Sequence, residues 1–382
     1  MNTRLLYDNI YTTLTGKYTD GKTELDFLSA TALSSIFRKK AENFVRKNHY
    51  APLTESEESE IRGYFAGCPG FSTVFHRLYK GFTGEFHPEY IPDDLYYSYI
   101  EPFMTDRRAS RYMDNKCYYP RLFPDVKMPP VICNRTGRIW TDADGKRITA
   151  REALDLAGQR GDVVVKAAEN SQGGQGLFFL SGAEIRTRFK EAVRSIEGDI
   201  TVQELFLQHE EFEKLHPGSV NTVRILSFLP ARPEGPAPDH FGEDGGTRIL
   251  SMAVRIGTGQ SRVDNVCSGG LICGVNENGA LTESAFSPTG SPVYEHPDLG
   301  YAFSGITLPG IDSAVRLVKQ IHPRVGKFRL SSWDIAVDRN GEAALIEANF
   351  SLGIIMELQA VNGPLFGGRT PELLREVFGK RR

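Results

Sequence analysis

Residues 332–349, SWDIAVDRNGEAALIEAN, constrain the fold most, because they place charged side chains within two apolar segments. The stretch 338–341 has the composition of a turn, so the two segments predict a β-hairpin. Glu347 and Asn349 are two residues apart and share one face of their strand. Asp334 lies on the preceding strand, at a position compatible with the same face. Burying a carboxylate is costly without a cation, so this hairpin predicts an ion site.

The hairpin also favours a particular ion. Two carboxylates and an amide offer hard oxygen ligands, and Mg²⁺ takes a few such ligands from a protein and the rest from phosphates and water. We therefore predict that Asp334, Glu347 and Asn349 bind Mg²⁺. A solvated hairpin without an ion is the alternative.

A second feature is a lysine near the end of the apolar segment 163–168, VVVKAA, which predicts a buried strand. A glycine-rich stretch follows this strand, with Ser171, Gly173, Gly174 and Gly176. Glycine lets the backbone approach a ligand, so that successive N–H groups can surround phosphate oxygens, and Lys166 supplies a positive charge. The lysine precedes the glycines, unlike in GxxxxGK[ST], and the glycines do not open a helix as in GxGxxG. A plain hairpin loop between 163–168 and 177–180 is the alternative.

Arginines interrupt two further apolar strands, Arg224 in 219–228 and Arg255 in 247–256. Beside Lys166, two guanidinium groups would bind phosphate and stabilise the charge that develops in acyl or phosphoryl transfer. Asn265 would add an amide donor to this anion site. A structural ion pair for each arginine is the alternative.

The N-terminal part of the chain has a sequence pattern that favours helices. The apolar periodicity over 25–48 predicts an amphipathic helix, and Thr54 with Glu57 predicts a capping box. Residues 71–118 are rich in aromatic side chains, which we interpret as a helical packing module, with a sugar-stacking surface as the alternative.

Strands and helices interleave from residue 130 onward, which predicts a mixed α/β structure. The segment 137–148 predicts a hairpin that turns at Asp144-Gly145, and Thr149 with Glu152 caps a helix that ends at Gly158. The segment 311–321 predicts another helix, and the Pro-, Gly- and acid-rich segment 230–247 predicts a surface insertion between strands.

Composition excludes several classes of protein. The 382 residues carry a formal net charge of −3, so we expect no nucleic-acid partner. Hydrophobic residues are 40% and charged residues 24%, as in ordinary globular proteins. The five cysteines show no CxxC spacing, the N-terminus lacks the apolar core of a signal peptide, and no apolar run has the length of a membrane span. We expect a cytoplasmic protein without membrane insertion.

Taken in order, these segments resemble the ATP-grasp superfamily, and more closely the sugar-transfer associated ATP-grasp family. The features that carry the resemblance span roughly residues 110–360, and they are DNK at 114–116, VVKAAENSQGGQGL, QELFLQH, HPGSVNTVRI, DNVCSGGL and WDIAVDRNGEAALIEAN. The resemblance implies an α/β (α+β) ATP-grasp fold over 111–382, after a mainly helical region at 1–110. Within it, a lid subdomain would cover about 130–205 and a metal-binding subdomain about 206–382.

The resemblance also implies roles for individual residues. Lys116 and Lys166 match the two lysines that reach ATP phosphates, and the stretch from Ser171 to Gly176 matches the lid above them. Adenine would contact the hinge strand, and ribose one of three residues that follow it; the candidates are Gln203, Glu204 and Phe206 for adenine and Gln208, His209 and Glu210 for ribose.

The remaining roles concern charge. Asp334, Glu347 and Asn349 match the magnesium triad, with Glu347 bridging two ions, and Arg224 and Arg255 would stabilise phosphate transfer. Ligases of the superfamily often have an Asn-x-Asn pattern after the metal glutamate. Here the stretch 350–353 follows Asn349 instead, so we expect the acceptor side of the site to differ from that of those ligases.

The activity implied is that of a carboxylate–amine ligase that uses ATP and Mg²⁺ and forms an amide through an acyl phosphate. Its partners would be a small-molecule carboxylate and an amine, either free or sugar-linked, in the tailoring of a polysaccharide or secondary metabolite. An ATP-grasp kinase and a non-catalytic nucleotide-binding module are the alternatives.

Overall fold

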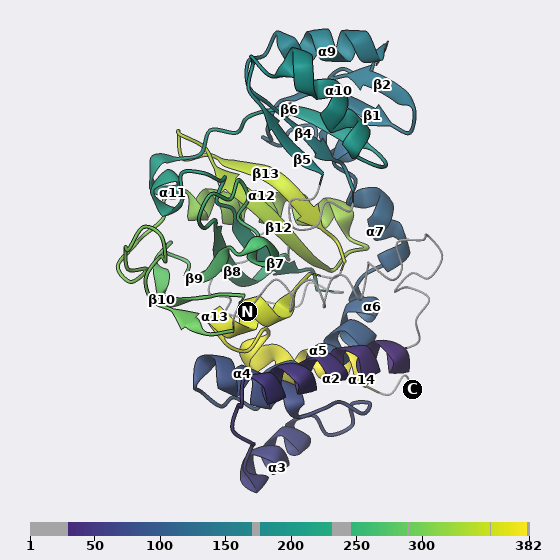
Figure 1. Ribbon diagram of the computed structural model, residues 1–382. Coiled ribbons are helices and arrows are strands. Elements are labelled where there is room, and N and C mark those ends of the chain that lie inside the picture. The colour runs from purple at the N-terminus through teal and green to yellow at the C-terminus, as the bar shows by residue number, and fades with distance from the viewer. Residues whose placement is uncertain (1–29, 170–175, 231–245, 289, 352, 380–382) are drawn as a thin grey trace.

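The computed structural model describes residues 30–169, 176–230, 246–288, 290–351 and 353–379 (Figure 1). It contains a six-stranded sheet of order β3-β2-β1-β6-β4-β5 and a seven-stranded sheet of order β11-β10-β9-β8-β7-β12-β13. Every strand pair in both sheets is antiparallel. The expected combination of helices and sheets is confirmed.

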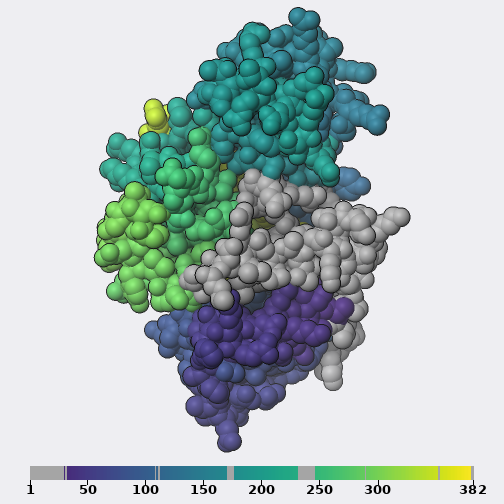
Figure 2. Space-filling view, viewed as in Figure 1, coloured from purple at the N-terminus to yellow at the C-terminus, as the bar shows by residue number. Residues whose placement is uncertain are grey.

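Short helices form most of the N-terminal region, purple and blue at the bottom of Figures 1 and 2. They are α2 (Ala30–Lys47), α3 (Glu55–Tyr64), α4 (Val74–Thr83), α5 (Asp93–Leu95), the π-helix η3 (Tyr96–Ile100), α6 (Glu101–Met104) and α7 (Arg107–Met113). The amphipathic helix predicted over 25–48 is confirmed from Ala30 onward, and residues 25–29 lie outside the described residues. The predicted capping box of Thr54 and Glu57 is present at α3.

The aromatic side chains of this region serve mainly as packing, as predicted. Phe37 stacks on Tyr97 with ring centroids 4.4 Å apart, and Tyr79 stacks on Tyr90 at 4.7 Å. Among the described aromatic residues between 71 and 118, Phe103 and Tyr112 are the exposed ones, which leaves little material for a sugar-stacking surface.

The six-stranded sheet stands at the top of Figure 1 with two helices against one face. Its strands are β1 (Val131–Thr136), β2 (Ile139–Asp142), β3 (Arg147–Ile148), β4 (Val163–Ala167), β5 (Leu177–Leu180) and β6 (Ile200–Glu204). The covering helices are α9 (Ala150–Gly158) and α10 (Ile185–Ser195). The predicted turn at Asp144-Gly145 and the capping box of Thr149 and Glu152 are confirmed. A short 3₁₀ helix η4 (Lys116–Tyr118) and α8 (Tyr119–Leu122) precede this sheet.

The seven-stranded sheet is covered on both faces. Its strands are β7 (Val223–Phe228), β8 (Arg248–Ile256), β9 (Leu271–Val275), β10 (Leu281–Phe286), β11 (Pro292–Val293), β12 (Leu330–Val337) and β13 (Ala343–Asn349). The remaining helices are α11 (Glu210–Leu215), α12 (Ile311–Ile321), α13 (Ile355–Asn362) and α14 (Thr370–Phe378), with short 3₁₀ turns at 266–268, 322–325 and 367–369. Helix α12 packs on one face, and α13 packs between the other face and the N-terminal helices. Of the predicted insertion at 230–247, residues 231–245 lie outside the described part.

Gln359 of α13 fastens the N-terminal region to the C-terminal end of the chain. Its side-chain oxygen accepts hydrogen bonds from Ile91 N at 2.9 Å and Leu365 N at 3.2 Å, and its Nε2 donates to Ile91 O at 3.0 Å. Gln359 is fully buried.

None of the described helices has the length and hydrophobicity needed to traverse a bilayer.

We expect Gln359→Leu to lower the free energy of unfolding by about 2–3 kcal/mol, because it leaves buried backbone groups of Ile91 and Leu365 without partners. Urea denaturation monitored by circular dichroism measures this change. Gln320→Leu removes an exposed glutamine that bonds Asp125 at 3.1 Å, and it should shift stability by no more than about 0.5 kcal/mol. Equal effects of the two substitutions would contradict the fastening role of Gln359.

Candidate functional site

One face of the six-stranded sheet carries a row of polar side chains. Val163, Val165 and other alternate residues of the sheet pack against α9 and α10. Lys166 of β4 therefore faces away from these helices, and it lies opposite Thr201 of β6, which in turn lies opposite Asn134 of β1. Thr201 Oγ1 and Asn134 Oδ1 are buried without a hydrogen-bond partner among the described residues. This face therefore holds polar groups that the described part of the chain does not satisfy.

Lys166 has an unusual electrostatic position. Burial and the neighbouring charge of Lys116 lower its pKa from 10.5 to about 7, although Glu347 acts in the opposite direction. No hydrogen bond or ion pair joins its ammonium group to the described residues, and its side chain keeps some exposure. An anion at this position would restore the positive charge.

Lys116 connects the two sheets. Its backbone N–H donates to Ala168 O at 2.9 Å, just after β4, and its Nζ bonds Glu347 Oε1 of β13 at 2.7 Å. Asn115 fixes the turn, because its side chain accepts from Cys117 N at 3.0 Å and donates to Asp199 at 2.8 Å. The two lysines predicted to bind phosphate therefore meet near Glu347. The predicted glycine-rich lid falls largely outside the described residues, since Ser171, Gly173 and Gly174 lie in 170–175 and Gly176 alone is described.

Asp334 of β12 lies opposite Glu347 on one side and opposite Arg224 of β7 on the other. Arg224 donates from two nitrogens to its two oxygens at 2.8 and 2.9 Å, and Arg255 of β8 donates to Oδ2 at 2.7 Å. Burial alone would raise the pKa of Asp334, but the two guanidinium groups outweigh it and lower the pKa. Asp334 is thus a buried anion held by two cations.

Arg255 is held on its other side by the loop that follows β8. It donates to Asp264 at 2.7 Å and also to Asn265. Asp264 in turn accepts from the backbone N–H of Thr222 at 2.9 Å and from its hydroxyl at 2.5 Å. The ion pairs considered as an alternative for the arginines are therefore present. Binding of phosphate by Arg224 and Arg255 stays a prediction.

The donor set of the predicted metal site is present on the hairpin. The Glu347 side chain is 30% exposed, and Asn349 Nδ2 is buried without a hydrogen-bond partner among the described residues, so no hydrogen bond of this nitrogen to them fixes the orientation of the amide. Asp334 is only 2% exposed and would exchange an arginine contact for a metal. The described residues contain no cluster of three or more His, Cys, Asp or Glu suited to a metal. Two carboxylates and an amide nevertheless fit Mg²⁺ chemically, and the assignment stays a prediction.

The residues predicted to bind adenine and ribose differ in how far they are buried and in whether they already have partners. Gln203 shares the face of Lys166 and Thr201 and is buried, whereas Glu204 pairs with Arg160 at 3.4 Å and Phe206 is half-buried. The three ribose candidates are consecutive, and the structure separates them. Gln208 is buried with its amide bonded to Ser219 O and Asn221 N, whereas His209 is half-exposed at the start of α11 and Glu210 is exposed.

The N-terminal region reaches the segment 350–355, which follows the metal candidates. Tyr97 OH donates to Gly353 O at 3.1 Å, Ser110 Oγ lies 2.8 Å from Ser351 Oγ, and Phe350 N donates to Asp114 at 3.0 Å. Burial raises the pKa of Asp114 to about 7. No sequence signal marked Tyr97 or Ser110, whereas Asp114 opens the DNK segment and had received no role.

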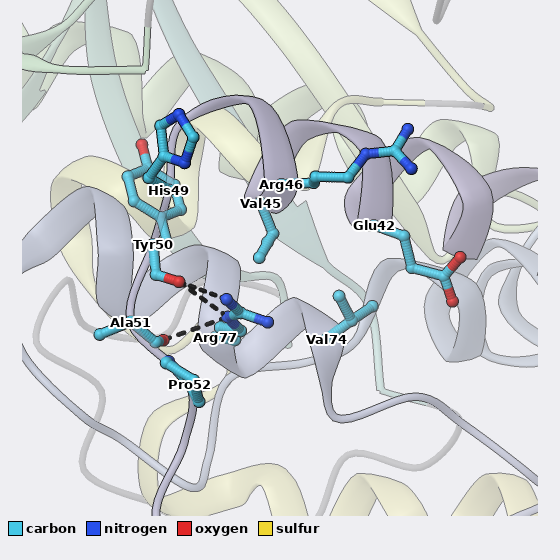
Figure 3. Close-up of a pocket in the computed structure, with 9 residues that line it drawn as sticks. All are labelled: Glu42, Val45, Arg46, His49, Tyr50, Ala51, Pro52, Val74 and Arg77. Carbon is cyan, nitrogen blue, oxygen red and sulfur yellow. Dashed lines mark hydrogen bonds between the residues drawn. The ribbon is translucent and has the colours of Figure 1, made fainter.

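A separate cavity of about 570 Å³ lies in the N-terminal region, between α2 and α4 (Figure 3). Its lining residues are Glu42, Val45, Arg46, His49, Tyr50, Ala51, Pro52, Val74 and Arg77. Arg77 points at the carbonyl oxygens of Tyr50 and Ala51 and bonds both. None of the predicted site residues lines this cavity.

Comparison with known proteins identifies a family over most of the chain. The model of the sugar-transfer associated ATP-grasp family matches residues 97–372. No protein with a curated record matches the sequence.

Several solved structures match part of the chain at low identity. The biotin carboxylase of Campylobacter jejuni is 12% identical, with a TM-score of 0.40, and the match covers 70% of this chain and 47% of that one. The D-alanyl-alanine synthetase A of Vibrio cholerae is 14% identical, with a TM-score of 0.37 and coverage of 69% and 64%. The biotin carboxylase domain of the Hydrogenobacter thermophilus 2-oxoglutarate carboxylase, solved with MgADP and bicarbonate, is 12% identical, with a TM-score of 0.39 and coverage of 71% and 46%.

The chain thus spans about half to two thirds of the length of these proteins.

We expect Asp334→Asn to destabilise the protein far more than Glu347→Gln. Removing the charge of Asp334 leaves the positive charges of two arginines, one of them 5% exposed, only partly compensated. Breaking a buried ion pair in this way lowers the free energy of unfolding by about 3–5 kcal/mol. The Glu347 side chain is 30% exposed, and a glutamine at this position still offers an oxygen acceptor to the Lys116 ammonium, so its substitution should cost less than about 1 kcal/mol. Denaturant unfolding of both variants checks the ranking, and a reversed order would show that Asp334 does not organise the centre.

The low pKa of Lys166 predicts a pH-dependent stability. The group titrates near 7 in the folded chain and near 10.5 when unfolded, so the unfolded state binds more protons between these values. Lys166 therefore costs stability progressively as the pH falls from about 10 to about 7. Lys166→Met removes this cost, so the variant should gain stability relative to the wild type over that fall in pH. Urea unfolding at pH 7, 8, 9 and 10 measures the difference, and a constant difference would contradict the shifted pKa.

Proposed function

Since this chain belongs to the sugar-transfer associated ATP-grasp family, we propose that it is an ATP-dependent carboxylate–amine ligase. Its substrates would be a small-molecule carboxylate, such as an amino acid, and an amine, either free or sugar-linked, in polysaccharide or secondary-metabolite tailoring. The observation that carries the proposal is the meeting of Lys116, Lys166 and Glu347 between the two sheets.

The chemistry proposed requires no nucleophile from the protein, and the cysteines are consistent with this. Burial raises the pKa of Cys117, Cys133 and Cys267 to about 12, which keeps these thiols protonated and unreactive at neutral pH. The histidines also have structural partners. His216 bonds Ser219 and Gly259 O, and the buried His322 bonds Ser227 and Phe328 O.

The proposed reaction has two steps. A substrate carboxylate oxygen attacks the γ-phosphorus of ATP, the bond to the β-phosphate oxygen breaks, and ADP leaves an acyl phosphate behind. The amine nitrogen then attacks the acyl carbon, phosphate departs with the bonding electrons, and the amine loses a proton to solvent or base. The protein contributes alignment and charge neutralisation.

The residues of the site divide this work. Lys166 and Lys116 would bind the phosphate oxygens, and Arg224 and Arg255 would stabilise charge on the transferred group. Mg²⁺, held by Asp334, Glu347 and Asn349, would neutralise phosphate charge when bound. Adenine would lie along the strand that contains Gln203 and Glu204, and Asn265 would keep Arg255 oriented through their hydrogen bond.

An ATP-grasp kinase is the second candidate, because the same charged centre would also transfer a phosphoryl group to an acceptor. A nucleotide-product assay across a panel of amino acids and amino sugars separates the two. ADP release that depends on the amine supports the ligase. ADP release without any amine, together with a stable phosphorylated product, would replace it by the kinase.

Turnover should depend most on Glu347. Glu347→Gln preserves size but removes charge next to Lys116, so we expect ADP formation to fall at least roughly a hundredfold, or about 2.7 kcal/mol of transition-state stabilisation. Glu342→Gln is the matched control, because it lies on the same hairpin, pairs with Lys127 at 2.5 Å and is exposed. ADP formation and thermal melting are measured on the same preparations. Near-normal magnesium-dependent turnover in a folded Glu347→Gln protein would overturn the assignment of this hairpin.

A further inference from the structure

One side-chain contact crosses from the seven-stranded sheet to the six-stranded sheet. Arg262 lies in the loop between β8 and β9, and its guanidinium carbon is 4.2 Å from the centroid of the Phe179 ring on β5. Arg262 is exposed and makes no hydrogen bond or ion pair with other described residues. Within the described residues, the guanidinium group of Arg262 therefore interacts with the Phe179 ring.

Phe179 belongs to the polar face described above. It lies opposite Val164 of β4, while Leu177 lies opposite Lys166, two residues further along the same strand pair. Side chains two residues apart on a strand share a face, so Phe179 and Lys166 lie on the same side of the sheet. This is the side that faces away from α9 and α10.

Arg262, at the other end of the contact, lies close in sequence to residues that hold Arg255, which together with Arg224 binds Asp334. Arg262 stands two residues before Asp264, which bonds Arg255 and Thr222. The loop is tight around Arg262, because Ser261 Oγ donates to Val263 O at 2.8 Å and accepts from Val263 N at 3.2 Å. A short, hydrogen-bonded stretch therefore joins Arg262 to the residues that orient Arg255.

We propose that Arg262 and Phe179 form a clasp that couples nucleotide binding on the six-stranded sheet to the orientation of Arg255 in the other sheet. Arg262 is then a positioning residue, since it acts through Phe179 and Asp264. The clasp rests on the proposed function for its nucleotide, but it is independent of the identity of the acid and the amine. A guanidinium group stays charged at all accessible pH values, so the contact between Arg262 and Phe179 does not itself titrate.

The size of the effect follows from the type of contact. A cation–π contact at a partly exposed position changes an equilibrium constant about two- to fivefold. The contact affects nucleotide binding through the difference in its strength between the free and the bound state, so loss of either partner should weaken nucleotide binding by up to this factor, and loss of both should weaken it no further than loss of one.

A double-mutant cycle tests this coupling. The dissociation constant of a non-hydrolysable ATP analogue with excess Mg²⁺ is measured calorimetrically for the wild type, Arg262→Ala, Phe179→Leu and the double variant. Phe178→Leu is the matched control on the opposite face of β5, and Arg138→Ala is an exposed arginine of the same sheet. Both controls should bind like the wild type. Unchanged binding in the single variants, or losses that add in the double variant, would overturn the clasp.

Hydrogen exchange provides a second readout that a purely structural contact would not change. In the wild type, nucleotide should increase protection both in β5 and in the loop 257–270. In Arg262→Ala, the protection of β5 should remain and that of the loop should be lost. Retained protection of both segments in this variant would overturn the coupling. A wild type that binds no nucleotide at all would instead contradict the proposed function.

Discussion

The buried charge of Asp334 is the constraint that organises the centre of the larger sheet. A carboxylate that is 2% exposed requires cations nearby, and three consecutive strands of the sheet supply and place them. Arg224 comes from the adjacent strand and Arg255 from the one beyond it, and Asp264 balances the second guanidinium from the far side. The centre is therefore close to neutral, which makes it tolerable in the interior and sensitive to any single substitution.

This centre explains which features were predictable from the sequence. The hairpin of β12 and β13 could be predicted because apolar strands with a polar turn allow few other structures, and Glu347 and Asn349 follow from the two-residue repeat of a strand. A structural ion pair for each arginine was an alternative, but Asp334 could not be predicted as the shared partner, because strand order determines this pairing and the sequence does not state which strands are neighbours. Lys116 and Glu347 are 231 residues apart, and their ion pair likewise depends on the assembled fold.

The contribution of the N-terminal region was the least predictable part. Its aromatic residues indicated packing, and most of them are buried, but nothing in their spacing shows that Tyr97 would hold the segment after β13. Tyr97 belongs to a π-helix, whose extra residue per turn shifts the direction of the side chains and often occurs at functional positions. A helical region that resembles a separate packing unit in the sequence is therefore continuous with the wall of the candidate site.

The position of β13 at the edge of its sheet has a consequence for how the chain folds during synthesis. The segment 114–127 covers the strand's open side: Tyr119 OH bonds both Ala348 N and Ala348 O, and Leu345 N donates to Lys127 O at 2.9 Å. An uncovered apolar edge is a template for pairing with another chain. The covering segment lies more than 200 positions earlier in the chain, so it is already synthesised when β13 emerges. It is therefore available to cover the edge of β13 before that edge pairs with a second molecule.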